Sequence, residues 1–325
     1  MSERICLMLK LILIYLSQAN WARSIVQKWS FARKIASRFV AGEKLDEAIT
    51  VIKDLNNRGI FTTLDHLGEN VSSREEAIQA ADEVITIMDR LVDEKVPSGI
   101  SIKLSQIGLI IDPDICQENL IRILEKAKGK NIFIRIDMED SSLTQVTLDL
   151  FESARKDGYE AYTGIVIQSS LLRSRDDVKR LMSKSCRVRI CKGAYKEPRS
   201  VAFTKKSAVD ENFDKITELL LDQSLEIESS VTLDGAFPPI PAIATHDQTR
   251  VDHALQYADR IGLGKRGLEF QMLYGIREDI QENLIERGYP VRVYVPYGSE
   301  WYPYFVRRLA ERPANLWFFI SNLFR

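Results

Sequence analysis

The chain has few of the residues that usually form metal sites or disulfide frameworks. Its 325 residues include four cysteines and three histidines, with no CxxC pair and no histidine at the spacing of metal ligands. Zinc-finger patterns are therefore excluded, and the cysteine spacing does not indicate a disulfide scaffold. We expect reduced thiols in a reducing compartment, hence a cytoplasmic protein, and we expect no bound metal.

The chain also lacks an excess of charge and a long hydrophobic run. Its 45 basic and 46 acidic residues leave a formal net charge of −1, so a nucleic-acid partner is not expected. The apolar run at 5–16 is interrupted by Lys10. It is too short to span a bilayer and has no small-residue cleavage site of a secretory signal.

Basic and apolar residues alternate over 21–40 in the pattern of an amphipathic helix. Such a helix either covers a core or lies on a membrane surface, and both interpretations stay open. If the helix lies on a membrane, the protein is a peripheral one at the inner membrane face.

Strand-like and helix-like segments alternate through the rest of the chain. Short runs rich in β-branched residues occur at 60–67, 100–104, 132–138, 164–168, 187–191, 242–245, 268–272 and 291–295. Amphipathic segments separate them, at 74–92, 116–127, 143–154, 209–221, 251–261 and 277–287. Eight such units predict a parallel (βα)8 barrel of the TIM type, with an N-terminal helical arm at 1–55 and the barrel with C-terminal helices at 56–325.

An open, doubly wound sheet is the alternative fold. It would carry a glycine-rich turn after its first strand, but the only GxGxxG match, at 262–267, precedes a strand. The interval between the fifth and sixth strands is the longest and contains a proline-rich piece, so we expect an insertion at about 224–241.

Many charged side chains fall at positions where the strands should face the barrel interior. These positions are Ser101, Lys103, Arg135, Asp137, Arg187, Arg189, Glu269, Gln271, Arg292 and Tyr294. Burying charges is costly unless partners or a ligand meet them. We expect a polar upper half of the barrel with a ligand site at the carboxyl ends of the strands, where barrel enzymes place their chemistry. A purely structural ion-pair network is the alternative.

The segment 291–311 joins the last strand to a helix that carries Tyr304, Arg307 and Arg308 on one face. Two guanidinium groups side by side suit a small carboxylate and predict an anion clamp. The alternative is a solvated helix face with an i,i+4 ion pair.

These motifs resemble the proline dehydrogenase family in its monofunctional bacterial form. The resemblance rests on seven blocks in order: SIKLSQIG (101–108), IRIDMED (134–140), IVIQ (165–168), RICKGAYKEP (189–198), ATHD (244–247), EFQMLYG (269–275) and YVPYGSEWYPYFVRRLAERP (294–313). Together they are spread over roughly residues 60 to 313. The resemblance implies a distorted (βα)8 barrel that oxidises L-proline to pyrroline-5-carboxylate by hydride transfer to FAD, the first step of proline catabolism.

The resemblance also implies roles for individual residues. Substrate-binding residues would be Lys103, Leu273, Tyr294, Tyr304, Arg307 and Arg308. Catalytic residues would be Asp137 and Arg189, with Arg189 placed against the flavin, where a cation stabilises developing negative charge. FAD would contact Met138, Gln168, Arg189, Lys192, Gly193, Ala194, Thr245 and His246. On the residues alone, His246 is equally well explained as a hydrogen-bonded core histidine.

The resemblance implies partners as well. Electrons would pass from FAD to a quinone-type acceptor, and the product would leave for a separate pyrroline-5-carboxylate dehydrogenase. The basic segment 21–40 and an apolar tail at 316–324 would then contact a membrane surface. Two other classes stay open: a Schiff-base aldolase-type barrel using Lys103 or Lys192, and a non-catalytic barrel that binds a flavin or an amino acid.

Overall fold

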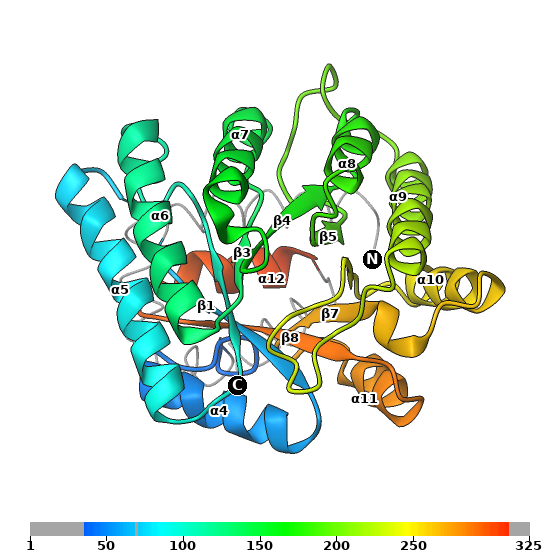
Figure 1. Cartoon of the computed structure of the whole chain (residues 1–325), viewed down its shortest axis with the longest axis horizontal. Helices are drawn as coiled ribbons and strands as arrows, with labels where there is room; N and C mark the ends of the chain where they lie inside the picture. The colour runs from blue at the N-terminus through cyan, green and yellow to red at the C-terminus, as the bar shows by residue number, and fades with distance from the viewer. Residues whose placement is uncertain (1–35, 69–70, 312–325) are drawn as a thin grey trace, which may run out of the picture.

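Eight parallel strands close into a barrel in chain order, β1 to β8 (Figure 1). The structure is a computed structural model that describes residues 36–68 and 71–311. The strands are β1 (Phe61–His66), β2 (Gly99–Ile102), β3 (Ile134–Ile136), β4 (Thr163–Gln168), β5 (Val188–Cys191), β6 (Pro241–Ala244), β7 (Glu269–Leu273) and β8 (Val291–Tyr297). The predicted (βα)8 barrel is confirmed, and each predicted strand overlaps an observed one.

Helices surround this barrel. They are α4 (Leu45–Asn57), α5 (Arg74–Asp93), α6 (Pro113–Lys130), α7 (Thr144–Ala154), α8 (Ser174–Met182), α9 (Lys206–Glu226), α10 (Gln248–Arg260), α11 (Glu278–Glu286) and α12 (Trp301–Glu311). Short helical turns lie at Arg155–Tyr159 and Lys265–Gly267. None of the helices described is long and apolar enough to cross a membrane. Helix α8 was not among the predicted segments, because only Val178 and Leu181 form its buried apolar face.

Local sequence signals fix several helix ends. Ser73 caps α5 by accepting a hydrogen bond from the Glu76 N–H, and Glu76 reaches back to the Ser72 N–H. Helix α6 starts with Asp112 as N-cap and Pro113 in its first turn, and it ends at Asn131 in the left-handed conformation. These ends set where each helix returns the chain to the next strand.

The predicted N-terminal arm is described only from residue 36. Helix α4 packs against β1 and β8 through Ile49, Ile52 and other buried residues. The Ala41 N–H donates to the Pro296 carbonyl at 2.8 Å, which ties residues before α4 to the end of β8. The predicted apolar run at 5–16, most of the basic segment 21–40 and the tail at 316–324 lie outside the described residues.

The predicted insertion between β5 and β6 closes one end of the barrel. Residues 227–240 follow α9 and cross the amino-terminal ends of the strands; in Figure 1 they lie in front of β7 and β8, with α12 behind the barrel. Phe237 packs edge-on against Phe133 and Tyr162, and the Gly235 carbonyl accepts a hydrogen bond from Arg292. The opposite end of the barrel, where the strands have their carboxyl ends and α12 follows β8, holds the candidate functional site.

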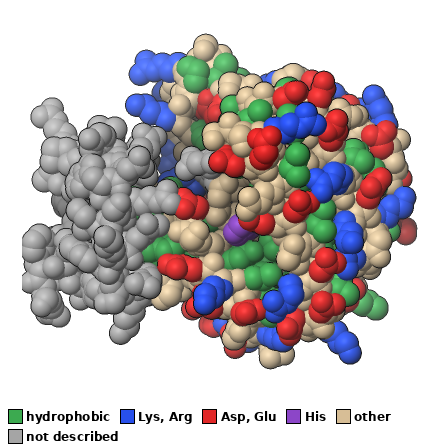
Figure 2. All heavy atoms as spheres, turned by 90° about the vertical axis from the view of Figure 1, so that its left-hand side faces the viewer, with side chains coloured by type: hydrophobic (Ala, Val, Ile, Leu, Met, Phe, Trp, Pro, Cys, Tyr) green, Lys and Arg blue, Asp and Glu red, His purple; other side chains and the backbone are tan. Residues whose placement is uncertain are grey.

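The outer surface of the barrel mixes charges of both signs. Figure 2, which faces the side where α5 lies, shows acidic and basic side chains interspersed over the described surface. This pattern agrees with the formal net charge of −1. The concentration of charge that distinguishes this protein lies inside the barrel.

Candidate active site

Charged side chains from five strands meet at the carboxyl ends of the barrel. Lys103 Nζ lies 3.2 Å from Asp65 Oδ1 and 3.6 Å from Asp137 Oδ2. Asp137 Oδ1 accepts a hydrogen bond from Arg189 Nη1, and its Oδ2 accepts one from the Tyr294 hydroxyl, both at 2.8 Å. We call these five residues the upper cluster. Two carboxylates face two cations. Asp65, Lys103 and Asp137 lie at or just past strand ends, whereas Arg189 and Tyr294 lie within β5 and β8.

Arg189 is held on all three of its nitrogens. Nε donates to Gln271 Oε1 at 2.5 Å, Nη1 to Asp137, and Nη2 to the Ser101 hydroxyl at 3.2 Å. Its guanidinium carbon also lies 5.4 Å from the centroid of the Tyr294 ring. Strands β2, β3, β7 and β8 therefore fix the position of this cation.

Burial dominates the protonation behaviour of the upper cluster. It raises the pKa of Asp65; the Lys103 ammonium opposes this shift and the Asp137 carboxylate adds to it. Burial also raises the pKa of Tyr294 well above its usual value, reinforced by Asp137 and Asp65. Tyr294 thus stays protonated and acts as a hydrogen-bond donor, whereas burial disfavours the ionised form of Asp65.

Asp65 was missed by the sequence reasoning. It lies within the predicted first strand, at 60–67, but is not among the inward-facing positions predicted from the sequence. Asp65 follows Thr63 by two residues on β1, so the two side chains lie on the same face of the strand. The strand register pairs Asp65 with Ser101 of β2. The alternation Thr63, Asp65 was the signal that could have found it.

A second charged layer lies deeper in the barrel, in addition to the polar upper half that the sequence predicts. Arg292 pairs with Glu269 through Nε and Nη2, both at 2.9 Å, and Nη1 donates to the Thr62 carbonyl. Arg135, 1% exposed, donates through Nη1 to the Ile165 and Arg187 carbonyls. Arg135, Glu269 and Arg292 start their strands, so alternation places them inward but near the sealed end. We call Glu269 and Arg292 the lower pair.

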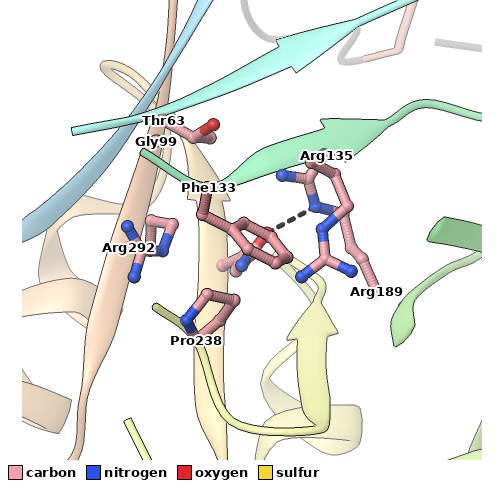
Figure 3. A pocket seen from close by; sticks show the side chains of 8 residues that line it. Thr63, Gly99, Phe133, Arg135, Arg189, Pro238 and Arg292 are labelled. Carbon is pink, nitrogen blue, oxygen red and sulfur yellow. Dashed lines mark hydrogen bonds between the residues drawn. The ribbon is translucent and has the colours of Figure 1, made fainter. Parts of the chain in front are cut away.

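A small cavity separates the two layers. It has a volume of about 10 Å³ and is lined by Thr63, Gly99, Phe133, Arg135, Arg189, Pro238, Gln271 and Arg292. In Figure 3, Arg292 lies on one side of it, and Arg135 and Arg189 lie on the other. Its size suits roughly one water molecule. It leaves no room for a substrate between the two layers.

The remaining predicted substrate residues lie on β7 and α12. Leu273 ends β7 and is half-buried. Tyr304 is 6% exposed, and the guanidinium carbon of Arg308 lies 5.0 Å from the centroid of its ring. Arg307 and Arg308 are half-buried on α12. Lys103 Nζ lies 3.4 Å from the Tyr294 hydroxyl, whereas Tyr304 and Arg308 lie together on α12, the helix that follows β8.

The predicted cofactor residues at the ends of β3, β4 and β5 form a cradle. Gln168 Nε2 donates to the carbonyls of Met138 and Glu139 at 3.0 and 2.8 Å. Its Oε1 is buried and has no hydrogen-bond partner among the described residues. Gly193 has φ +97°, and a Cβ at this position would lie 2.8 Å from Gln168 Oε1. A buried acceptor next to a glycine that leaves room suits the N–H edge of a flat heterocycle such as a flavin.

The other predicted cofactor residues sit beside this cradle. Lys192 Nζ forms ion pairs with Asp210 at 2.5 Å and Asp247 at 2.7 Å, so it is not a free surface lysine. Ala194 follows it in an exposed loop, and Thr245 is buried just past β6.

His246 has a defined hydrogen-bonding role. Its Nε2 accepts a hydrogen bond from the Leu273 N–H at 2.9 Å, and its carbonyl accepts one from Arg277. An accepting Nε2 requires a ring that is not protonated there. His246 therefore links the end of β6 to the end of β7, as the core-histidine interpretation expects.

The fold and this site define a class: a (βα)8-barrel enzyme with a charged pocket at the carboxyl ends of its strands and a glycine-lined cradle beside it. The sequence model of the proline dehydrogenase family matches residues 48–320. The chain belongs to this family.

Curated relatives cover nearly the whole chain. Proline dehydrogenase 2 of Bacillus subtilis (strain 168) is 40% identical over 310 residues, which is 95% of this chain and 97% of the relative. Proline dehydrogenase of Deinococcus radiodurans is 38% identical over 90% of each chain. Proline utilization A from Bdellovibrio bacteriovorus matches in structure with a TM-score of 0.78 and 27% identity, over 86% of this chain and 33% of that one. The chain spans about a third of that larger protein.

Proposed function

We propose that this chain oxidises L-proline to pyrroline-5-carboxylate with FAD as the hydride acceptor. The observation that carries the proposal is the upper cluster: Arg189 is held by four strands at the point where the barrel opens, in a member of the proline dehydrogenase family. Proline loses a hydride from the ring carbon next to nitrogen and a proton from nitrogen, which leaves a C=N bond. A bound flavin supplies the chemistry of accepting the hydride.

Cationic side chains bind the substrate carboxylate in this proposal. Arg307 and Arg308 offer planar donor groups from α12, and Lys103 offers an ammonium group from the end of β2. Lys103 is already flanked by Asp65 and Asp137. It thus enters the site charged and oriented, which lowers the entropy cost of placing the substrate.

The hydrophobic part of the proline ring meets Leu273 and the two tyrosines, Tyr294 and Tyr304. Tyr294 is fixed through its hydroxyl to Asp137, and Tyr304 through its ring to Arg308. These side chains orient the ring and exclude water from the reacting carbon.

Arg189 provides the electrostatic part of catalysis. A preorganised cation beside the hydride acceptor stabilises negative charge as it develops, and four strands hold it without reorganisation. Gln168 and the main chain of Met138 and of 192–194 would hold the flavin, with Thr245 and His246 at the next strand end. Both Asp137 oxygens already accept hydrogen bonds, so we assign Asp137 to holding Arg189 and Tyr294 rather than to removing a proton.

The lysines argue against a Schiff-base aldolase. Such a lysine must be neutral to attack a carbonyl and is usually activated by desolvation or by a neighbouring cation. Here Lys103 lies between Asp65 and Asp137, and Lys192 between Asp210 and Asp247. Both ammonium groups are ion-paired with carboxylates instead.

The test of the proposed function is a visible absorption spectrum of the purified protein, before and after proline is added without oxygen. Flavin bands that bleach with proline would support both the cofactor and the substrate. Bands that persist would contradict proline as the substrate. A colourless protein that FAD does not reconstitute would contradict the cofactor and favour the aldolase or the non-catalytic barrel.

We also propose that the electrons leave to a quinone-type acceptor and that the N-terminal arm contacts a membrane surface. The support is the alternation of basic and apolar residues over 21–40. The control is the same protein without residues 1–35, because Ala36, Phe39 and Val40 are buried in the fold. In liposome flotation the full chain should float and the truncated one should stay behind; two soluble forms would overturn the membrane contact.

A further inference from the structure

Three hydrogen bonds in series connect Arg292, Glu269, Gln271 and Arg189. Arg292 donates to Glu269, Gln271 Nε2 donates to Glu269 Oε1 at 2.6 Å, and Gln271 Oε1 accepts from Arg189 Nε at 2.5 Å. The dashed line in Figure 3 marks this last contact. All four side chains are at most 6% exposed. The sealed end of the barrel is thereby connected to the cation of the upper cluster.

The charge of Glu269 decides which way the Gln271 amide points. An ionised carboxylate can only accept hydrogen bonds, and Arg292 holds Glu269 with two charge-assisted contacts. The amide nitrogen of Gln271 must therefore face Glu269, which leaves its oxygen facing Arg189. A reversed amide would set oxygen against oxygen at one end and donor against donor at the other.

The neutrality of Gln271 matters as much as its orientation. Arg189 has one carboxylate, Asp137, in direct contact. A second carboxylate in the place of Gln271 would add negative charge beside Arg189 and neutralise more of its field, and it would also set a carboxylate oxygen against Glu269. An amide supplies the acceptor and keeps the positive charge available to the carboxyl end of the barrel.

We infer that Gln271 is a positioning residue that fixes Arg189 against the hydride acceptor, with its own amide fixed by the Glu269–Arg292 pair. Gln271 acts through Arg189 and not on the substrate. The inference rests on the proposed function, because it assigns Arg189 the task of stabilising charge on the acceptor.

Two substitutions separate geometry from charge. Gln271→Met keeps a side chain of similar length but removes the acceptor. Gln271→Glu keeps an oxygen acceptor for Arg189 but adds a carboxyl group and removes the amide donor to Glu269. Gln281→Met is the matched control: Gln281 is also buried, at 2% exposed, but donates to the Ile276 carbonyl on the outside of the barrel. The three variants are compared with the wild type as FAD-loaded enzymes.

The decisive measurement is the midpoint potential of the bound flavin, titrated without substrate. We expect Gln271→Met and Gln271→Glu each to lower the equilibrium constant for flavin reduction about tenfold, which is about 30 mV for a two-electron couple. We also expect kcat to fall with KM for proline nearly unchanged, because the carboxylate contacts are intact. Gln281→Met should leave the potential and both kinetic constants at their wild-type values.

Wild-type potentials in both Gln271 variants would overturn the inference, even if their thermal stability fell, because a purely structural glutamine would produce that result. An equal shift in Gln281→Met would overturn it too. These outcomes differ from failure of the proposed function, in which proline does not bleach the flavin of the wild-type protein.

Discussion

The two charged layers inside the barrel have similar side chains and opposite organisation. In the lower pair, Arg292 gives three of its nitrogens to Glu269 and to the carbonyls of Thr62 and Gly235, under the cover of residues 227–240. In the upper cluster, Lys103, Asp65, Asp137, Tyr294 and Arg189 share partners across five strands. In the lower pair, all three nitrogens of Arg292 have hydrogen-bond partners, and the pair lies at the sealed end. In the upper cluster, the charged groups share their partners with one another, and the cluster lies at the open end.

We infer from this difference that the lower pair mainly stabilises the fold, whereas the upper cluster serves substrate binding and catalysis. A buried ion pair whose hydrogen bonds are all made loses several kcal/mol when one partner is removed. In a cluster where each charge has several partners, removing one residue lowers the free energy of unfolding less. It does change the geometry on which substrate binding depends. Substitutions in the two layers should therefore affect different measurements.

The largest effect on stability is expected from Glu269→Ala. It leaves the buried Arg292 guanidinium without its carboxylate, which should lower the free energy of unfolding by about 3 to 5 kcal/mol. Urea unfolding measures this change. The control is Glu282→Ala, which removes the carboxylate of an exposed pair with Arg58 and should leave stability nearly unchanged. Equal free energies of unfolding in Glu269→Ala and Glu282→Ala would contradict the claim that the buried pair stabilises the fold more than the exposed one.

The largest effect on catalysis is expected from Arg307→Met. Loss of a guanidinium contact to the substrate carboxylate should cost about 2 to 5 kcal/mol of transition-state binding, a fall in kcat/KM of roughly 30- to 5,000-fold. Steady-state kinetics with proline measures it. Arg58→Met, at the other end of the barrel, is the matched control and should keep wild-type kinetics. If Arg307→Met also kept wild-type kinetics, Arg307 would belong to a solvated helix face and not to an anion clamp.

A smaller effect is expected from Tyr304→Ser. A phenol against the substrate ring should exclude an added hydroxyl, so its removal should narrow the preference for proline over hydroxyproline by about tenfold at most. The ratio of the two kcat/KM values reports this change. Tyr257→Ser on α10, where the hydroxyl bonds to Asp222, should leave the ratio unchanged. An unchanged ratio in Tyr304→Ser would exclude Tyr304 as a determinant of specificity.

The sequence predicted the barrel well because eight β-branched runs separated by amphipathic segments have few other solutions. It missed α8, whose short apolar face leaves little periodic signal. It also located the residues near Arg189, because alternation along a strand decides which side chains point inward.

Alternation does not say how deep a side chain lies. Strand length places Glu269 and Arg292 near the starts of β7 and β8, at the sealed end, and the register places Gln271 beside Arg292. The partners of Asp65 likewise depend on the pairing of β1 with β2 and β8. The division into two layers therefore required the three-dimensional structure.

The separation between the layers is tested most directly by the free energy of unfolding of Asp65→Asn, measured with urea between about pH 4 and pH 8. Because burial raises the pKa of Asp65, the folded state binds this proton more tightly than the unfolded chain does. The stabilisation that comes from protonated Asp65 is therefore fully present below the ordinary pKa of an aspartate, about 4. It is lost as the pH rises through the pKa of Asp65 in the folded protein. We predict that Asp65→Asn is at least as stable as the wild type at pH 7.5, with the difference shrinking toward pH 4. A loss at pH 7.5 as large as that of Glu269→Ala would contradict the account.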